Sequence, residues 1–393
     1  MKRSPLTVLF TTIFIDLLGF GLIIPILPTF SKELGATDLE TGLLASAYSL
    51  MTFLFAPLWG TLSDRIGRRP VILFSITITG LAYLLFAHSN TLLIVMLSRI
   101  LAGIGSANIS AAQAYIADIT TPENRAKNMG MIGAAFGLGF IFGPPVGGFL
   151  KGNYGIDMVG YVAASLSFIN LIMAYFSLPE SLKEKNKLKK FTFRPITDLA
   201  MELKKPVISE LFTINFIFIT AFSMMQMTGA LLWREQYGLD VKEIGYMFMY
   251  IGILGAIIQG GLVGRLNKKF GERKLLLAGN VFMAIGLVML PFAPKEFFLL
   301  VNMIGLACIA IANGCMMPSI TSLLSQVADK KEQGRVLGLN QSFGSLARVV
   351  GPAIGGLLYG LNYHSPYIMG AFIMIIALVL ANVLVNQKLK IKS

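Results

Sequence analysis

Charged side chains interrupt long apolar stretches at three places in this chain of 393 residues: Asp16, Arg99 and Arg348. In a helix that starts near Leu6 and rises ~1.5 Å per residue, Asp16 lies ~15 Å below the start, and Arg99 falls within ~4–5 Å of the same depth. Charged groups are costly inside a bilayer, so such residues are candidates for function. Arg99 should face protein or water and favour an acidic partner. Arg348, ~20 Å into its own stretch, is the third candidate.

Each of these charges also has a purely structural alternative. Asp16 could be a neutral, hydrogen-bonded acid, and Arg99 could be satisfied by backbone carbonyl groups. Asn and Gln side chains also hold membrane helices together without binding a ligand. With this alternative open, the residues that could line a substrate cavity are Asn108, Gln113, Phe136, Gln226, Trp233, Gln341 and Arg348.

The composition indicates the elements that must position these residues. Hydrophobic residues make up 55% of the chain and charged residues 13%, whereas soluble domains carry about 25% charged residues. At ~20–25 residues per span, about twelve membrane helices fit. We expect an all-α protein with spans at about Leu6–Phe30, Leu39–Leu62, Val71–Ala87, Leu92–Ile119, Asn128–Leu150, Asp157–Leu178, Val207–Trp233, Val241–Leu266, Leu275–Ala293, Phe297–Val327, Arg335–Leu361 and Pro366–Val385.

The net charge of +13 does not indicate a nucleic-acid partner. Most lysines and arginines fall in segments that the alternation of spans places in the cytoplasm, as the positive-inside rule requires. The two cysteines, Cys308 and Cys315, share one span and give neither a disulfide framework nor a metal-binding spacing. We expect no cofactor and no metal, cytoplasmic termini, and a first span that is retained rather than cleaved as a signal peptide.

The segment Gly60–Pro70, GTLSDRIGRRP, is a short charged island between two apolar runs. It predicts a tight cytoplasmic loop in which Gly60 and Gly67 permit close approach and reversal. Pro70 suits the first turn of the next helix. Asp64 is placed to bind guanidinium groups of its own loop or of a neighbouring helix.

An internal repeat divides the chain into two related halves. Gly143-Pro144-x-x-Gly147-Gly148 returns 208 residues later as Gly351-Pro352-x-x-Gly355-Gly356, and GRLNKKFGERK at 264–274 echoes the segment 60–70 with Lys268 in place of Asp64. Such repeats are typical of transporter architectures. We expect bundles at 1–178 and 207–393, joined by a basic cytoplasmic linker at 179–206, with a charge latch in the first half that is weakened in the second.

Together these motifs resemble those of the major facilitator superfamily, over essentially the whole chain. The segment 60–70 matches its loop 2–3 signature, Arg99 with its following glycines resembles the helix 4 motif R-x-x-x-G-x-G-x-A, and the small residues of helix 5 resemble the antiporter motif G-x-x-x-G-P-x-x-G-G. The last motif comprises Gly139, Gly143, Pro144, Gly147 and Gly148. The resemblance is to the twelve-span drug:proton antiporters, and in the first half to tetracycline-resistance exporters.

The resemblance implies a fold of two six-helix bundles, alternating access about a midplane cavity, and proton-coupled export of amphipathic small molecules across the cell membrane. It gives Asp16 and Arg99 the proton coupling, and a cytoplasmic charge latch to Asp64, Arg65, Arg68 and Asp118. The expected partners are substrate, protons and membrane lipids, without nucleic acid, and the expected state is a monomer.

One departure limits the resemblance. Tetracycline exporters carry further membrane acids in helices 3 and 9 and a histidine in helix 8, whereas helix 3 here has Ala82 and Tyr83 in that region. Tetracycline is therefore not assigned as the substrate. A facilitator or proton symporter for a sugar or organic acid is the alternative function. The chain lacks the cluster of His, Cys or paired acidic residues that an enzyme would need, so we expect no enzymatic activity.

Overall fold

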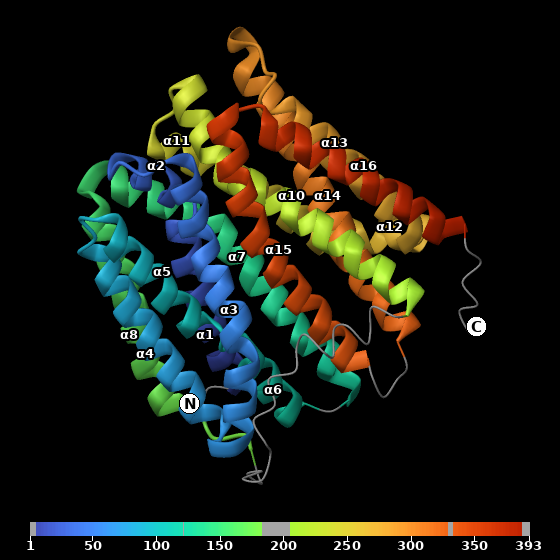
Figure 1. Ribbon diagram of the computed structural model, residues 1–393. Helices are drawn as coiled ribbons and strands as arrows, with labels where there is room; N and C mark the ends of the chain where they lie inside the picture. The colour runs from blue at the N-terminus through green and yellow to red at the C-terminus, as the bar shows by residue number, and fades with distance from the viewer. Residues whose placement is uncertain (1–4, 121, 183–204, 329–332, 387–393) are drawn as a thin grey trace. The chain divides into compact units, whose positions relative to one another are not determined.

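The computed structural model describes residues 5–120, 122–182, 205–328 and 333–386, and within these ranges it is helical without strands (Figure 1). The first half contains α1 (Pro5–Ile23), α2 (Leu27–Glu33), α3 (Asp38–Ile66), α4 (Arg68–Ala87), α5 (Leu92–Ser106), α6 (Ile109–Ile119), α7 (Pro122–Tyr154) and α8 (Ile156–Ser177). The second half contains α10 (Pro206–Tyr237), α11 (Val241–Ile257), the π-helix η1 (Ile258–Leu262), α12 (Val263–Phe270), α13 (Glu272–Met289), the short η2 (Lys295–Phe297), α14 (Phe298–Val327), α15 (Gln333–Leu361) and α16 (Ser365–Asn386).

The all-helical prediction is confirmed, and each predicted span corresponds to one helix or to consecutive helices. Eight spans of the described chain are long and apolar enough to cross a membrane by a strict hydropathy criterion. These eight were found among the described residues alone, and parts of α7 and α15, which carry the glycine-rich motifs, lie outside that search. The predicted linker lies mostly outside the described residues, so the predicted division of the chain into two bundles stays a prediction.

Two predicted spans are broken in the structure. The first is interrupted at residues 24–26, between α1 and α2, where Pro25 and Pro28 cannot supply backbone donors. The fourth is interrupted at Ala107 and Asn108, between α5 and α6, without a proline. Prolines alone therefore do not decide where a helix breaks, since Pro144 and Pro145 lie inside the continuous helix α7.

The prediction of a loop at Gly60–Pro70 is wrong. Helix α3 continues to Ile66 and α4 begins at Arg68, so only Gly67 lies between the two helices. Gly67 has a φ of +115°, a conformation that favours glycine. Pro70 falls in the first turn of α4, as predicted. The charged residues are therefore held on helix ends rather than on a loop.

The described chain forms two compact units. Unit 1 contains residues up to 36, residues 47–193 and residues 239–249; unit 2 contains residues 37–46, 194–238 and 250 onward. In unit 1, α1 packs on α7 and α8, and α4 packs on α5 and α8. In unit 2, α10 packs on α15 and α16, and α13 packs on α14 and α16. The start of α3 thus belongs to unit 2, and most of the first half of α11 to unit 1.

In unit 1, the glycines of α7 let it approach the backbone of α1. A Cβ atom on Gly143 would lie 2.6 Å from Cα of Gly21, and one on Gly139 would lie 2.9 Å from the carbonyl oxygen of Leu17. Gly147 contacts Leu22 more tightly still. This face of α7 therefore needs glycine, because a side chain would separate the two helices.

The next face of α7 receives the start of α11, also within unit 1. A Cβ atom on Gly148 would lie 2.6 Å from the carbonyl oxygen of Val241, and one on Gly245 would lie 2.7 Å from that of Pro144. The repeat of this motif in unit 2 is used in the same way, since Gly355 faces Met224 of α10, Gly356 faces Asp38, and Gly42 faces Pro352. Each copy of the motif thus packs against two helices.

We expect Gly143→Ala to destabilise the protein by about 1–3 kcal/mol, the usual cost of overpacking. Thermal or denaturant unfolding of the purified protein in detergent measures the loss. Gly137→Ala is the matched control on the same helix, because a Cβ atom there meets nothing within 4 Å. Equal stability of the two variants would contradict the close approach of α7 to α1.

Candidate functional site

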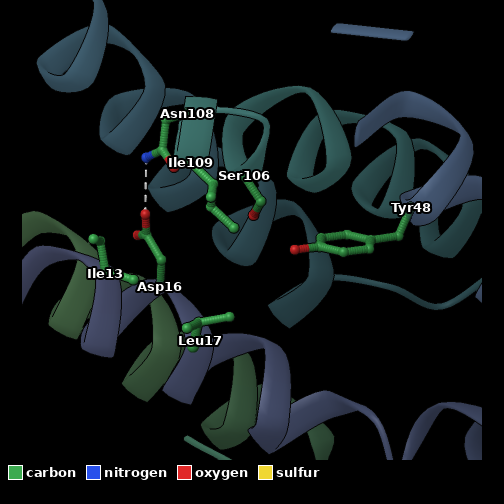
Figure 2. A pocket seen from close by; sticks show the side chains of 7 residues that line it. All are labelled: Ile13, Asp16, Leu17, Tyr48, Ser106, Asn108 and Ile109. Atoms are coloured by element: carbon green, nitrogen blue, oxygen red, sulfur yellow. Dashed lines mark hydrogen bonds between the residues drawn. The ribbon is translucent and has the colours of Figure 1, made fainter. Parts of the chain in front are cut away.

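Asp16 and Asn108 meet inside unit 1. The side-chain amide of Asn108 donates a hydrogen bond of 2.9 Å from Nδ2 to Oδ2 of Asp16 (Figure 2). Asp16 is 6% exposed and Asn108 3% exposed. The break between α5 and α6 places Asn108 at the start of α6, where its side chain forms no helix cap and is directed to Asp16 instead. The sequence predicted both residues but not this contact.

The second carboxylate oxygen of Asp16, Oδ1, is buried without a hydrogen-bond partner. Asp16 borders a small cavity, about 10 Å³ for the centre of a water molecule, which is close to the minimum for one ordered water. Figure 2 shows the hydroxyl groups of Tyr48 and Ser106 on the same space. Its apolar walls are Ile13, Leu17 and Ile109. A buried acid with one unpartnered oxygen beside a cavity can bind and release a proton.

Arg99 is also buried, at 2% exposure. The expected acidic partner is absent: within the described part of the chain, no carboxylate lies within 4 Å of Arg99. Its Cζ atom instead lies 4.9 Å from the centre of the Phe86 ring, and Nε donates a weak 3.4 Å bond to Ser98. Nη2 has no partner. The face of the Phe86 ring in α4 offers the guanidinium group a cation–π contact instead.

Tyr83 lies on α4, one turn before Phe86, and sequence reasoning gave it no role. It is 1% exposed, and its hydroxyl group has no hydrogen-bond partner. The hydroxyl oxygen lies 2.6 Å from the position that a Cβ atom on Gly19 would take. Tyr83 interacts electrostatically with both Arg99 and Asp16. Tyr48, which borders the cavity at Asp16, interacts electrostatically with Arg99 as well.

A second polar site lies where α3 meets α4. Arg68 is the centre: Nη1 lies 2.5 Å from Oδ1 of Asp64, and Nε lies 3.1 Å from Oδ2 of Asp118. Nη1 also donates to the hydroxyl group of Ser63 at 2.6 Å. The structure thus brings together three of the four predicted latch residues. No described carboxylate pairs with the fourth, Arg65, whose buried Nε has no partner.

Glu180, just after α8, belongs to this latch and was missed from the sequence. Its carboxylate accepts the backbone N–H groups of Arg68 at 2.9 Å and Arg69 at 3.2 Å, and so binds the first turn of α4. Anions at a helix N-terminus are stabilised by the helix dipole. Ser181 adds a hydrogen bond of 3.0 Å to Asp118. The sequence signal was the acid in Leu-Pro-Glu-Ser, at the end of an apolar span.

Unit 2 contains the counterpart of the latch without an ion pair among the contacts described. Glu272, 204 residues after Arg68, accepts hydrogen bonds from Asn267 at 3.0 Å and Ser322 at 3.1 Å. Asn267 occupies the position of Ser63 in the repeat, and Ser322 lies near the end of the fourth span of its half, as Asp118 does in the first half. The second copy therefore keeps the same geometry with a carboxylate at the centre and neutral partners.

The other predicted cavity residues are spread over both units. Trp233 is fully buried and donates to Asn302 of α14 at 2.8 Å, so the indole joins two helices. Gln113, Gln226 and Arg348 are partly exposed, Gln341 is exposed, and the Phe136 side chain lies outside the described residues. Within the described chain, no group of three His, Cys, Asp or Glu side chains is placed to hold a metal ion.

Comparisons with known proteins decide the family. The model of the Major Facilitator Superfamily matches residues 9–268 and 260–390. The chain belongs to the Major Facilitator Superfamily. It is 33% identical to multidrug resistance protein 2 of Bacillus subtilis, covering 98% of this chain and 96% of the relative, and 33% identical to the class C tetracycline resistance protein of Escherichia coli, covering 96% of each.

Solved structures agree with this assignment. The human organic anion transporter MFSD10 has a TM-score of 0.75 at 25% identity, over 97% of this chain and 99% of that chain. A peptide transporter at 15% identity has a TM-score of 0.79 and supports the fold alone. The predicted twelve-span fold of the Major Facilitator Superfamily is thus confirmed. The chain is a membrane transporter that acts on small molecules.

We expect Glu180→Gln to destabilise unit 1 by about 1 kcal/mol, the size of a lost helix cap, because Arg68 and Arg69 lose an anionic acceptor. Unfolding of the purified protein measures the change. Glu33→Gln is the matched control: it breaks the more exposed pair with Lys151 (2.9 Å), and such surface pairs contribute about 0–1 kcal/mol. A control that is more damaging than Glu180→Gln would contradict the latch.

Proposed function

We propose that this transporter is a proton-coupled antiporter that exports amphipathic small molecules. The observation that carries the proposal is the buried Asp16 beside a small cavity, with one oxygen bound by Asn108 and the other buried without a hydrogen-bond partner. The printed names of its relatives, which include multidrug and tetracycline resistance proteins, support the export of drug-like compounds.

In this proposal Asp16 is exposed alternately to the two sides of the membrane. It takes up a proton from the outer side and releases it to the cytoplasm, and the same cycle carries substrate outward. Burial and a nearby cation act in opposite directions on the charge of a carboxyl group, so a change in its surroundings can load or unload the proton. The proton gradient supplies the energy, and no other cofactor is required.

The latch around Arg68 would hold the cytoplasmic end of unit 1 in one arrangement during part of the cycle. Its charge and that of the following linker support a cytoplasmic position for this end, in line with the positive-inside rule. Both termini then lie in the cytoplasm, and the transporter acts in the cell (inner) membrane as a monomer surrounded by lipid. The basic linker attracts anionic lipid headgroups.

We expect Asp16→Asn to abolish coupling, because the amide cannot carry the exchanged proton. The test uses everted membrane vesicles with an acidic lumen, to which tetracycline, a quinolone and ethidium are added in turn. Wild-type vesicles should take up an accepted compound and lose lumenal protons; the variant should match vesicles without the protein. Asp157→Asn, at the exposed start of α8, is the matched control and should behave as wild type.

Two results would overturn the proposal. Full proton exchange by the Asp16→Asn variant would remove Asp16 from the coupling. Proton movement in the same direction as the compound would indicate the alternative, a symporter.

A further inference from the structure

We propose that the hydroxyl group of Tyr83 connects Arg99 to Asp16. When Asp16 is ionised, the hydroxyl donates a hydrogen bond to Oδ1 of Asp16 and accepts one from Nη2 of Arg99. When Asp16 takes up a proton, both bonds open. This inference rests on the proposed exchange of a proton at Asp16, and it makes Tyr83 a positioning residue.

The first argument is placement. The hydroxyl oxygen of Tyr83 lies against Gly19 on α1, 2.6 Å from where a Cβ atom would be. Asp16 precedes Gly19 by three residues, and residues with this spacing are neighbours on one helix face, with ~5–6 Å between their Cβ positions. A small movement of the Tyr83 side chain therefore brings its hydroxyl group to Asp16.

Tyr83 also lies one helical turn from the contact between Phe86 and Arg99. Tyr83 and Phe86 lie one turn apart on α4, and the guanidinium group of Arg99 lies 4.9 Å from the Phe86 ring. Close contact between α4 and α5 fixes this arrangement, because Ser75 of α4 donates to the carbonyl oxygen of Gly105 and a Cβ atom on Gly105 would collide with Thr79. Tyr83 thus stands between the helix that carries the acid and the helix that carries the base.

The second argument is the set of unmatched groups. Nη2 of Arg99, the hydroxyl group of Tyr83 and Oδ1 of Asp16 are all buried without a hydrogen-bond partner. A guanidinium group can only donate, and an ionised carboxylate can only accept, whereas a phenol hydroxyl does both. One connection therefore satisfies all three groups, each of which is costly to leave unpaired.

Few other charged or titratable groups in the described part of the chain lie near Tyr83 and Asp16. Within the described residues, the charged or titratable groups that reach Tyr83 are Arg99 from α5, Asp16 from α1 and Tyr48 from α3. Of the helices packed on α1, α6 contributes the Asn108 amide to Asp16, and α7 and α8 contribute no described ionisable group to it. Ser106 shares the cavity with a buried, unpartnered hydroxyl of its own.

The open arrangement in the structure fits a protonated Asp16, which is neutral and does not require a second donor. Loss of the proton creates an acceptor with a full charge, and hydrogen bonds to charged groups are the stronger kind. The ionised state would therefore draw α4, and Arg99 with it, toward α1. Proton binding is in this way converted into a rearrangement of helices around the cavity.

The test is a pH titration of the protonated carboxyl band in the infrared spectrum of the purified protein, which requires no substrate. The difference between wild type and Asp16→Asn identifies the band of Asp16. In Tyr83→Phe the ionised acid loses a donor, so the midpoint should move to higher pH by about one unit, the effect of one hydrogen bond to a charged group. Tyr367→Phe, which removes a buried phenol hydroxyl from unit 2, is the matched control and should leave the midpoint unchanged.

A second measurement separates this role from packing. At a pH below the midpoint, where Asp16 is protonated, the melting temperature of Tyr83→Phe should equal or exceed that of wild type, because the hydroxyl group is then buried unpaired, as in the structure. An unchanged midpoint in Tyr83→Phe would overturn the inference, as would a midpoint that moves equally in Tyr367→Phe. Failure of the proposed function would appear instead as full proton exchange by Asp16→Asn in vesicles, so the two failures are distinct.

Discussion

The cost of an ionisable side chain in an apolar interior is the constraint on which this structure depends. Asp16 satisfies it in part, through a hydrogen bond from Asn108 at the point where α5 gives way to α6. Arg99 satisfies it in part with an aromatic ring. In both cases one polar atom is left over, which a residue selected only for stability would not require. The break in the helix and the unpaired polar atoms therefore fit one explanation, in which Asp16 gains and loses a proton.

Much of this architecture was readable from the sequence, because membrane spans are long apolar runs and the loops between them are short. The glycine motifs also predicted close helix packing, and the latch residues predicted an ion pair. Local detail was harder to obtain. The break at Ala107 and Asn108 has no proline to mark it, and Gly67 alone makes a turn that eleven residues were expected to share. Tyr83 was missed because a buried tyrosine in a span looks like an ordinary core residue. Its proposed role follows only from its position near Asp16 and Arg99.

The two latches show how a repeated framework can diverge. Arg68 holds two carboxylates in unit 1, whereas Glu272 holds neutral side chains in unit 2, yet the contacts come from similar positions in the two halves. Ion pairs respond to salt and to charge in their surroundings more strongly than neutral hydrogen bonds do. Both halves therefore share the arrangement of the contacts, but only the contacts in unit 1 should respond strongly to salt and to nearby charge. The sequence predicted the asymmetry from Lys268, although the residue at the centre of the second copy is Glu272.

The start of α3 packs on Gly356 and Pro352, and the start of α11 packs on Gly148 and Pro144. Each half of the chain thus contributes about ten residues to the compact unit of the other half, where they pack on its glycine motif. A chain cut in the linker would yield two fragments, each with an uncovered glycine motif and with a helix start that lacks its packing partner. Exchanging one half for that of a distant relative would therefore have to preserve the glycines of both motifs, because each motif packs against a segment from the other half of the chain.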